Sequence, residues 1–396
     1  MSSLAPIEIT IVMPCLNEAE TLEACLRKAR QGLARAGLAG EILVADNGST
    51  DGSLEIAERL GARVEHVQEK GYGCALRAGF DAARGKWILM GDSDDSYDFS
   101  DINGFVEKLR AGHDLVMGCR LPHGGGTIQP GAMPWKNRWI GNPVLSFIGK
   151  TFYKTPINDF HCGMRAFTKE AYARMELKTT GMEFASEMVM KATLKKMRVA
   201  ETPITLYPDG RSRPPHLKPW RDGWRHLRFM LIYSPRWLFL IPGLALSALG
   251  FFISALLYFL PARIGGIVLD VGTMVIGCML VIIGFQAVAF AFFTKTFAIA
   301  EGLLPDDPRL ARVFKSFTLD QGIFGGALML LAGLGLFFRA LWIWKMADFG
   351  TIPYPENLRR LVASTTIIVL AFQVIFSSFF MSVLGLKTTA RRPPAT

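Results

Sequence analysis

The hydrophobic positions divide the 396 residues of the chain into two parts of different character. Up to about residue 236, short apolar runs alternate with polar segments. Beyond it, four long stretches contain no charged residue, at positions 237–260, 271–294, 322–338 and 362–386. Each reaches the roughly 17–25 residues that a helix needs to cross a bilayer. Arg339 follows the third stretch directly and makes it the weakest of the four.

Four Gly- and Phe-rich stretches in succession are poorly explained as buried helices of a large soluble core. We therefore predict an all-α membrane domain at 237–396 with about four transmembrane helices. Residues 216–236 form a separate segment just before this membrane domain.

The first part has the pattern of an α/β domain, which we place at residues 1–215. Apolar runs at 7–13, 41–45, 62–67 and 86–90 predict strands, and the stretches between them predict helices. Asn17, with Glu20 three residues later, predicts an N-cap and a capping box at the start of the first helix. Strands that alternate with helices indicate a parallel sheet covered on both faces.

Three polar clusters follow predicted strands: "PCLNE", "DNGSTDG" and "GDSDD". In parallel α/β sheets, ligands bind beyond the carboxyl ends of the strands, so we expect the three clusters to form one site. A dinucleotide-binding oxidoreductase is a weak alternative. "GYGCAL" has only the first two glycines of GxGxxG, and it follows the third strand instead of the first.

The last cluster crowds four carboxylates into "MGDSDDSYDF", where like charges raise one another's pKa. A divalent cation shared with substrate phosphates would relieve that repulsion, and Mg²⁺ or Mn²⁺ prefers carboxylate oxygens. Asp92-Ser93-Asp94 is therefore a candidate metal motif, although most D-x-D sequences are solvated turns.

The formal net charge is +10, and much of the excess of basic residues lies just before the first apolar stretch. On a helix, one face there would carry Trp220, Trp224, Leu227 and Leu231, with Arg221, Arg225 and Arg228 beside it. This layout is typical of a helix that rests on anionic lipid, and an ordinary surface helix is the alternative. No nucleic-acid-binding module accompanies the charge, so we expect no nucleic-acid partner.

Cysteine usage and the amino terminus bear on the compartment. The six cysteines form no CxxC pair, which fits a reducing compartment. "MSSLAPIEITIVMP" has no basic segment leading into a long apolar core, so we expect the first part of the chain to stay cytoplasmic.

Basic residues flank the apolar stretches unevenly. The loop with Lys295, Arg309, Arg312 and Lys315, and the ending with Arg391 and Arg392, support cytoplasmic placement of both termini. The loop that would face outward also contains basic residues, Lys345, Arg359 and Arg360, and these weaken the predicted orientation.

Six blocks together resemble family 2 glycosyltransferases, and more closely the polyprenyl-phosphate sugar synthases of the dolichol-phosphate mannose and glucose synthase type. These blocks are "IVMPCLNEAETL", "ILVADNGSTDGS", "GYGCALRAGFDAARGKWILMGDSDD", "GCR", "DFHCGMRAF" and "EFASEM". The resemblance covers about residues 5–235. It implies a GT-A (Rossmann-like nucleotide-diphospho-sugar transferase) fold and transfer of a sugar from a nucleotide sugar to a lipid phosphate.

On the donor side, the resemblance implies nucleotide-sugar binding by Pro14, Asn17, Glu18, Asp46, Asp92 and Ser93. Asp92 and Asp94 match the metal and diphosphate motif. Where many relatives have Gln or His as a third metal ligand this chain has Ser96, and Asp95 is an alternative. Asp46-Asn47 stands where the family usually has two acidic residues, so the base of the donor stays open.

On the acceptor side, the resemblance implies contacts with the lipid phosphate from Arg120, Lys136, Arg138 and Arg165. Arg211 and Arg213 are further phosphate-binding candidates, with a membrane-surface role as the alternative. Lys136 and Arg138 could also be plain surface charges. The glycine-rich segment 124–134 is either a lid or a passive connector. Glu187, counted with Asp92, Asp94 and Arg165 among the catalytic candidates, is expected to act indirectly.

The resulting hypothesis is an integral membrane enzyme that uses Mg²⁺ or Mn²⁺. It would transfer a hexose, with inversion, to a polyprenyl phosphate at the cytoplasmic face. A processive polysaccharide synthase should carry Gln-x-x-Arg-Trp before its spans, and "PWRDGWRHL" does not supply it. A lipid-sugar transporter should have polar residues in mid-membrane, where only Gln286 and Gln373 qualify. The oligomeric state stays open, a homo-oligomer included.

Overall fold

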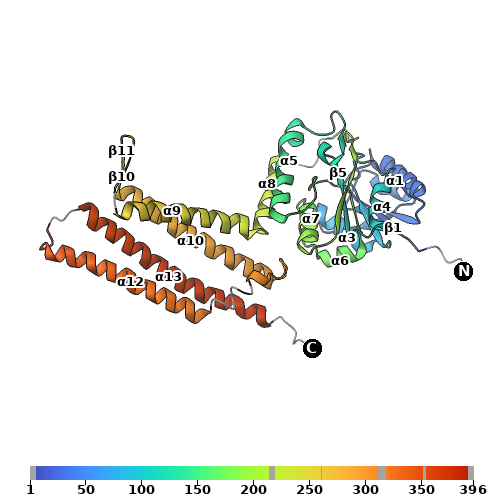
Figure 1. Ribbon diagram of the computed structural model, residues 1–396. Helices are drawn as coiled ribbons and strands as arrows, with labels where there is room; N and C mark the ends of the chain where they lie inside the picture. The colour runs from blue at the N-terminus through green and yellow to red at the C-terminus, as the bar shows by residue number, and fades with distance from the viewer. Residues whose placement is uncertain are drawn as a thin grey trace. The chain divides into compact units, whose positions relative to one another are not determined.

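The computed structural model describes residues 6–213, 219–259, 261–310, 312, 318–350 and 354–390. The chain divides into two compact units, Met1–Met230 and Leu231–Thr396 (Figure 1). Leu260, Lys315, Arg391, Arg392 and residues 216–218 lie outside the described part, as do both chain ends.

The first unit is built on a seven-stranded sheet with the order β3-β2-β1-β4-β7-β5-β8. Its strands are β1 (Ile9–Cys15), β2 (Gly40–Asp46), β3 (Arg63–His66), β4 (Trp87–Met90), β5 (Leu115–Cys119), β7 (Arg165–Thr168) and β8 (Val199–Pro203). β7 is antiparallel to both of its neighbours, β4 and β5, so the other six strands all run in one direction. A small second sheet pairs β6 (Thr127–Ile128) with β9 (Thr205–Leu206).

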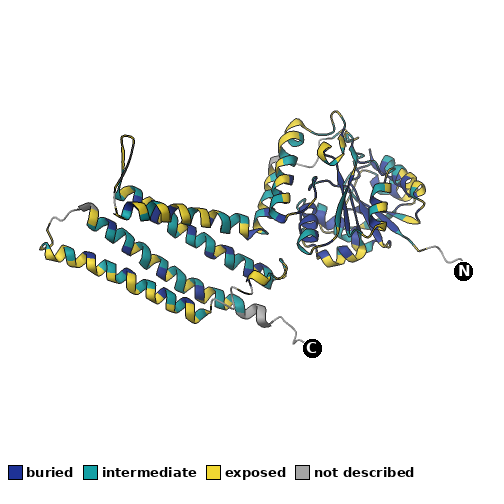
Figure 2. Ribbon diagram, in the orientation of Figure 1, coloured by how far each residue is buried: buried dark blue, intermediate teal, exposed yellow. Residues whose placement is uncertain are grey.

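Helices cover both faces of the large sheet (Figure 1). They are α1 (Leu22–Ala36), α2 (Ser53–Arg59), α3 (Tyr72–Ala82), α4 (Asn103–Arg110), α6 (Lys169–Met175) and α7 (Phe184–Leu194). Because both faces are covered, the central strands are continuous apolar runs, and Figure 2 shows them buried. The predicted α/β sheet is therefore confirmed.

Three further segments complete this unit. A 3₁₀ turn, η1, spans Pro122–Gly124. A π-helical turn, η2 (Asn137–Gly141), leads directly into α5 (Asn142–Tyr153). The last helix, α8, spans Pro219–Ile232, and Tyr153 of α5 donates a hydrogen bond to the carbonyl of Met230 in α8 at 2.7 Å.

The predicted capping role of Asn17 is wrong. Helix α1 begins at Leu22, and Thr21 is its N-cap residue. Asn17 has a left-handed backbone with φ of 59°, which asparagine tolerates better than most residues. Its Oδ1 accepts a hydrogen bond from the backbone N–H of Thr50 at 2.8 Å, so the side chain joins two loops instead of starting a helix.

The second unit consists mainly of long helices. They are the π-helical turn η3 (Arg236–Leu240) and α9 (Ile241–Phe259), α10 (Val271–Ala300), α12 (Leu319–Met346) and α13 (Tyr354–Ala390). A hairpin of β10 (Ala262–Ile264) and β11 (Ile267–Leu269) connects α9 to α10. Among the residues that the structure describes, four segments are long and apolar enough to cross a membrane: Arg236–Phe259, Val271–Ala300, Leu319–Met346 and Glu356–Gly385.

Glycines allow close packing between the membrane helices, as small residues do in lipid. A Cβ at Gly250 of α9 would lie 2.4 Å from the carbonyl oxygen of Gly277 in α10. The outer faces expose large apolar side chains such as Phe251, Phe324 and Trp342, which suits contact with lipid (Figure 2). Helix α12 continues unbroken past Arg339, whose side chain is exposed.

Candidate active site

The strand register brings the three polar clusters to one edge of the sheet. Cys15 at the end of β1 lies opposite Asp46 at the end of β2, and Val12 lies opposite Met90 at the end of β4. The loops that follow these strands therefore emerge side by side, as the sequence pattern predicts.

The loop after β1 is tied to the loop after β2 by hydrogen bonds. The backbone N–H of Asn17 donates to Ser49 Oγ, and that of Glu18 donates to Ser53 Oγ, each at 2.9 Å. Ser93 Oγ donates to the carbonyl of Pro14 at 2.7 Å and connects the same loop to the acidic cluster. Pro14, Asn17, Glu18 and Ser93 are thus brought together.

Asp46 is 3% exposed and shapes the loop that follows it. Its carboxylate accepts the backbone N–H groups of Gly48 and Ser49, both at 3.0 Å. Asn47 donates to the carbonyls of Val67 and Glu69, so it connects this loop to the end of β3. Base recognition by Asp46 stays a prediction.

Asp92 is held from two sides. The hydroxyl of Tyr72 donates to its Oδ1 at 2.9 Å, and Gly163 packs against its Oδ2. A Cβ at Gly163 would lie 2.6 Å from that oxygen, so any larger residue there would displace the Asp92 carboxylate. Burial and the charge of Asp94 raise the pKa of Asp92 to about 6, against the lowering effects of Tyr72 and two arginines.

Asp94 is fully engaged by protein donors. Its Oδ1 accepts the N–H of Ser96 at 3.1 Å and the Ser96 hydroxyl at 2.5 Å. Its Oδ2 accepts from the guanidinium of Arg211 at 2.9 Å. Glu18, which is 6% exposed, accepts from Arg211 at 3.2 Å and from Arg213 at 2.8 Å.

The donor set fits a divalent ion in part. Asp92 and Asp94 supply carboxylate oxygens beside a buried Glu18 Oε2 that makes no hydrogen bond. Among the residues that the structure describes, no group of three His, Cys, Asp or Glu side chains is arranged to hold a metal. The alternative third ligand, Asp95, instead pairs with Lys28 at 2.7 Å. A metal would thus take its remaining ligands from water or substrate oxygens.

Six cations were predicted to bind the acceptor phosphate. Two of them are buried, two lie at the surface, and two contact the predicted donor side. Arg120 forms a buried two-pronged ion pair with Asp159, at 2.7 and 2.9 Å. Arg165 is fully buried and donates to the carbonyls of Ala185 and Cys162. Lys136 is exposed, and Arg138 in η2 lies over the ring of Trp139, 5.5 Å from its centroid.

The remaining two, Arg211 and Arg213, contact Glu18 on the predicted donor side. Because their partners differ, the contacts of the described residues do not gather these six cations around one site. Phosphate binding by each of them stays a prediction.

Glu187 in α7 is fully buried and supports a loop. It pairs with Lys191 at 2.8 Å and accepts from the N–H groups of Lys178 and Thr179. Burial alone would raise its pKa, but the hydrogen bonds from Lys191 and Thr179 lower it. The neighbouring Thr180 carbonyl accepts the N–H of Gly73, next to Tyr72. This position fits the indirect role expected for Glu187.

Sequence reasoning missed the aromatic face of η2 and α5. Trp135, Trp139 and Phe147 are 65%, 61% and 69% exposed. They recur at helical spacing among the cations Lys136, Arg138 and Lys150, so the pattern analysis applied to residues 216–236 would have found them. In α8, Trp224 is 59% exposed, whereas His226 and Met230 are buried.

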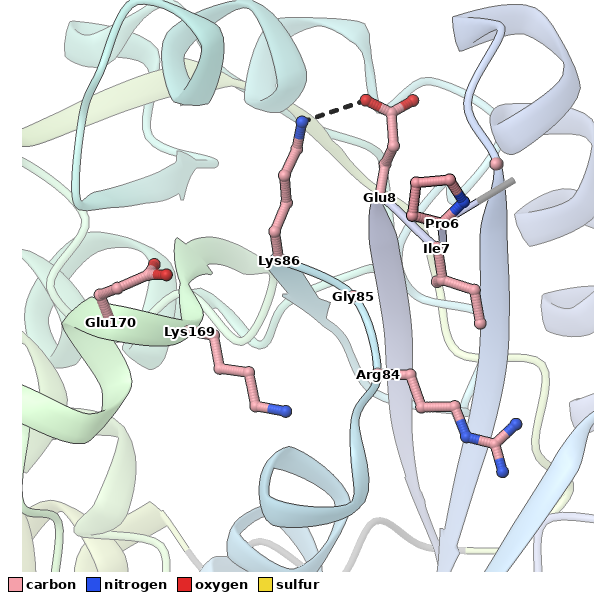
Figure 3. A pocket seen from close by; sticks show the side chains of 9 residues that line it. Pro6, Ile7, Glu8, Arg84, Gly85, Lys86, Lys169 and Glu170 are labelled. Carbon is pink, nitrogen blue, oxygen red and sulfur yellow. Dashed lines mark hydrogen bonds and ion pairs between the residues drawn. The ribbon is translucent and has the colours of Figure 1, made fainter. Parts of the chain in front are cut away.

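A separate pocket of about 470 Å³ lies at the opposite edge of the sheet, where β1 and β4 begin (Figure 3). Arg84, Lys86, Lys169, Glu8 and Glu170 supply its charged lining. Lys86 pairs with Glu8 at 3.1 Å, and Lys169 donates to the carbonyl of Ala83. None of the predicted site residues lines this pocket.

Comparisons with known proteins match both units. A model of glycosyl transferase family 2 matches residues 10–175, and one of the glycosyltransferase family 2 C-terminal transmembrane region matches residues 292–385. The low-salt glycan biosynthesis hexosyltransferase Agl6 of Haloferax volcanii is 36% identical over 385 residues, 97% of this chain and 90% of that protein.

Two shorter similarities accompany these. A dolichyl-phosphate hexose transferase of Haloferax volcanii is 28% identical over 201 residues, 50% of this chain and 82% of that protein. A crystal structure of glucosyl-3-phosphoglycerate synthase from Mycobacterium tuberculosis, in complex with Mn²⁺, UDP and glucosyl-3-phosphoglycerate, matches with 21% identity and a TM-score of 0.45. It covers 58% of this chain and 80% of that chain.

A mixed α/β sheet with an acidic loop at its carboxyl edge, followed by a membrane-spanning region, defines a membrane-bound glycosyltransferase. The chain belongs to glycosyltransferase family 2. The GT-A fold and the enzyme class expected from the sequence are both confirmed.

Proposed function

We propose that this enzyme transfers a hexose from a nucleotide-diphosphate sugar to a polyprenyl phosphate at the cytoplasmic face of the membrane. The observation that carries the proposal is the meeting of the Pro14–Glu18 loop, the Asp46 loop and the Asp92–Asp94 pair at one sheet edge. The chain joins that edge to four helices suited to a bilayer. The hexosyl group and the lipid phosphate are supported by the names of the two Haloferax relatives.

On the donor side, Asp92 and Asp94 would hold Mg²⁺ or Mn²⁺. When bound, the ion would neutralise the diphosphate and make it a better leaving group. The chain itself positions these carboxylates through Tyr72 and Ser96. The loops around Asn17 and Asp46 would orient the nucleotide.

On the acceptor side, a phosphate monoester needs little activation, because its second ionisation is near pH 6. The phosphate oxygen attacks the anomeric carbon, the bond to the diphosphate breaks, and in-line geometry inverts the configuration. Arg138 and Lys136 are accessible cations for that phosphate. The aromatic faces around Trp139 and Trp224 would rest on lipid and keep the prenyl chain in the membrane.

The test is a donor screen with the purified full-length protein, a phosphorylated prenol and Mn²⁺, with mass spectrometry of the lipid product. We expect one nucleotide sugar to give a prenyl-phosphate hexose. Asp92→Asn and Asp94→Asn should lower turnover by at least about a hundredfold while the melting temperature stays near that of the wild type.

Full activity in the presence of a chelator would contradict the metal role. Efficient glycosylation of an unphosphorylated lipid or a growing glycan would instead favour a processive synthase.

A further inference from the structure

Residues 207–213, which follow β9, lie across the loops of the predicted donor site; we call them the strap. The backbone N–H of Tyr207 donates to the carbonyl of Ser96, and that of Gly210 donates to the carbonyl of Asp94, both at 3.0 Å. Ser212 donates from its N–H and its hydroxyl to Glu20, at 2.7 and 2.5 Å. Arg213 donates to the carbonyls of Leu16 and Asn17.

Arg211 is the charged centre of the strap. Its guanidinium contacts three carboxylates, those of Glu18, Asp94 and Asp209, at 3.2, 2.9 and 3.0 Å. Its side chain is only 10% exposed, so solvent screens these pairs less than it screens surface ion pairs. A single arginine therefore offsets much of the negative charge on this side of the site.

Both carboxylate oxygens of Asp94 already accept hydrogen bonds within the protein. Ser96 donates twice to Oδ1, and Arg211 donates to Oδ2. A cation that binds Asp94 through Oδ2 would meet the guanidinium at close range, and the repulsion between the two positive charges favours release of Arg211 from that oxygen. The diphosphate of the donor offers the displaced guanidinium a new anionic partner with matching geometry.

We infer that Arg211 is an internal counter-ion, bound to Asp94 before the donor arrives and transferred to the donor diphosphate when the metal and the nucleotide bind. This inference rests on the proposed function, because it assumes a nucleotide-diphosphate donor and a metal at Asp92 and Asp94. Arg211 would then be a positioning residue. It weakens metal binding when no nucleotide is present and strengthens metal binding when the nucleotide is bound. Metal and nucleotide then bind with positive coupling.

The experiment measures Mn²⁺ affinity by electron paramagnetic resonance on the full-length protein in detergent, alone and with saturating UDP or GDP. Arg211→Ala should bind Mn²⁺ about ten- to a hundredfold more tightly than the wild type when no nucleotide is present. With the nucleoside diphosphate, the same variant should bind Mn²⁺ more weakly than the wild type. A merely structural arginine would not produce this change of sign.

Arg27→Ala is the matched control, because Arg27 pairs with an exposed carboxylate, Glu23, away from these contacts. Its Mn²⁺ affinity should equal that of the wild type in both conditions. Arg211→Gln, which keeps side-chain bulk, repeats the test if Arg211→Ala is poorly folded.

Equal or weaker Mn²⁺ binding by the folded Arg211 variants without nucleotide would overturn the counter-ion role. A failure of the proposed function looks different. In that case the wild type itself would bind no Mn²⁺, even with UDP or GDP, and would form no lipid-linked product.

Discussion

At the scale of single residues, the arginines of this enzyme differ in how far they are buried and in which groups they contact. Arg120 is 8% exposed and pairs with a fully buried Asp159, whereas Arg138 lies at the surface of η2 beside Trp139. A buried guanidinium that is saturated by a carboxylate has few donors left for a substrate. An accessible one can bind a phosphate with two parallel hydrogen bonds.

Arg138→Ala should therefore raise the apparent KM for the prenyl phosphate by about ten- to a hundredfold, because one charge-assisted contact is lost. The KM for the nucleotide sugar should change little. Steady-state kinetics with each substrate varied in turn makes this measurement. An equal rise of both KM values would place Arg138 outside the acceptor site.

Arg120→Ala supplies the contrast. Removal of one partner from a buried ion pair typically costs about 3–5 kcal/mol, because the other charge stays buried and unpaired. We expect a lower melting temperature and less folded protein, with a smaller effect on the acceptor KM of the molecules that remain folded.

Two buried histidines give a pH-dependent contribution to stability. His161 and His226 form an edge-to-face pair with ring centroids 4.8 Å apart, and His226 Nδ1 is 2.8 Å from Ser186 Oγ. Burial lowers the pKa of both rings, and the charges of Arg120 and Arg165 lower that of His161 further. Glu183 and Asp222 act in the opposite direction on His226.

Because both pKa values are lowered by folding, the native state keeps the rings neutral while the unfolded chain takes up protons below about pH 6.5. Stability should therefore be present above that pH and be lost as the pH falls toward the native pKa values. Thermal unfolding between pH 7.5 and 5 tests this. His161→Phe should show a weaker pH dependence of the melting temperature than the wild type; identical slopes would contradict the prediction.

At the scale of elements, α5 and α8 each bury one face and expose another that is rich in aromatic and basic residues. Tyr153 and Met230 join the two helices, and Ser186 and His226 join α8 to α7. Trp139, Phe147 and Trp224 remain exposed to a degree that is unusual for such large side chains. Such a surface suits the boundary between lipid headgroups and acyl chains.

A fluorescent NBD probe on Phe147→Cys should be quenched by spin-labelled lipids when the enzyme is in vesicles. The six native cysteines are all buried, which favours selective labelling of the new thiol. Arg84→Cys, an exposed position beside the pocket at the other sheet edge, is the control and should be quenched much less. Equal quenching at both positions would argue against a lipid-facing α5.

At the scale of the whole molecule, the charged residues at the helix ends bear on orientation in the membrane. Within the second unit, the carboxyl end of α10 and the carboxyl end of α12 lie at opposite ends of the bundle (Figure 1). All three basic residues that weakened the predicted orientation have partners. Arg359 pairs with Asp270, Arg360 lies 3.7 Å from Glu356, and Lys345 lies over the ring of Trp342, 5.5 Å from its centroid. We propose that the connection after α10 is cytoplasmic.

With four spans, Gly350→Cys should react with a membrane-impermeant maleimide from outside intact cells, and Asp306→Cys only after permeabilisation. Both positions lie between helices, and Asp306 is exposed. Labelling of the two cysteines from one side would contradict the four-span topology.

The same bundle pairs the two polar residues that the sequence analysis weighed against the transporter alternative. Gln373 Nε2 of α13 donates to Gln286 Oε1 of α10 at 3.0 Å. A hydrogen bond between helices satisfies polar groups in lipid and stabilises their association. This contact gives the two glutamines a structural role between α10 and α13.

The sequence by itself determined the features that depend on local patterns. The strands at Ile9–Cys15 and Gly40–Asp46, the four apolar helices and the convergence of three polar loops follow from side-chain periodicity and from the rule that parallel strands end at one edge. The family was recognisable because its motifs are short and continuous.

Only the tertiary structure decided which charges meet. Arg211 contacts Asp94 across 117 residues of sequence, and Arg120 contacts Asp159 across 39. Asn17 does not cap a helix as predicted, because its side chain accepts a hydrogen bond from the backbone N–H of Thr50, which is distant in the sequence. Periodicity specifies which face of an element is buried. Long-range ion pairs depend on strand order and on the path of each loop, which no local pattern encodes.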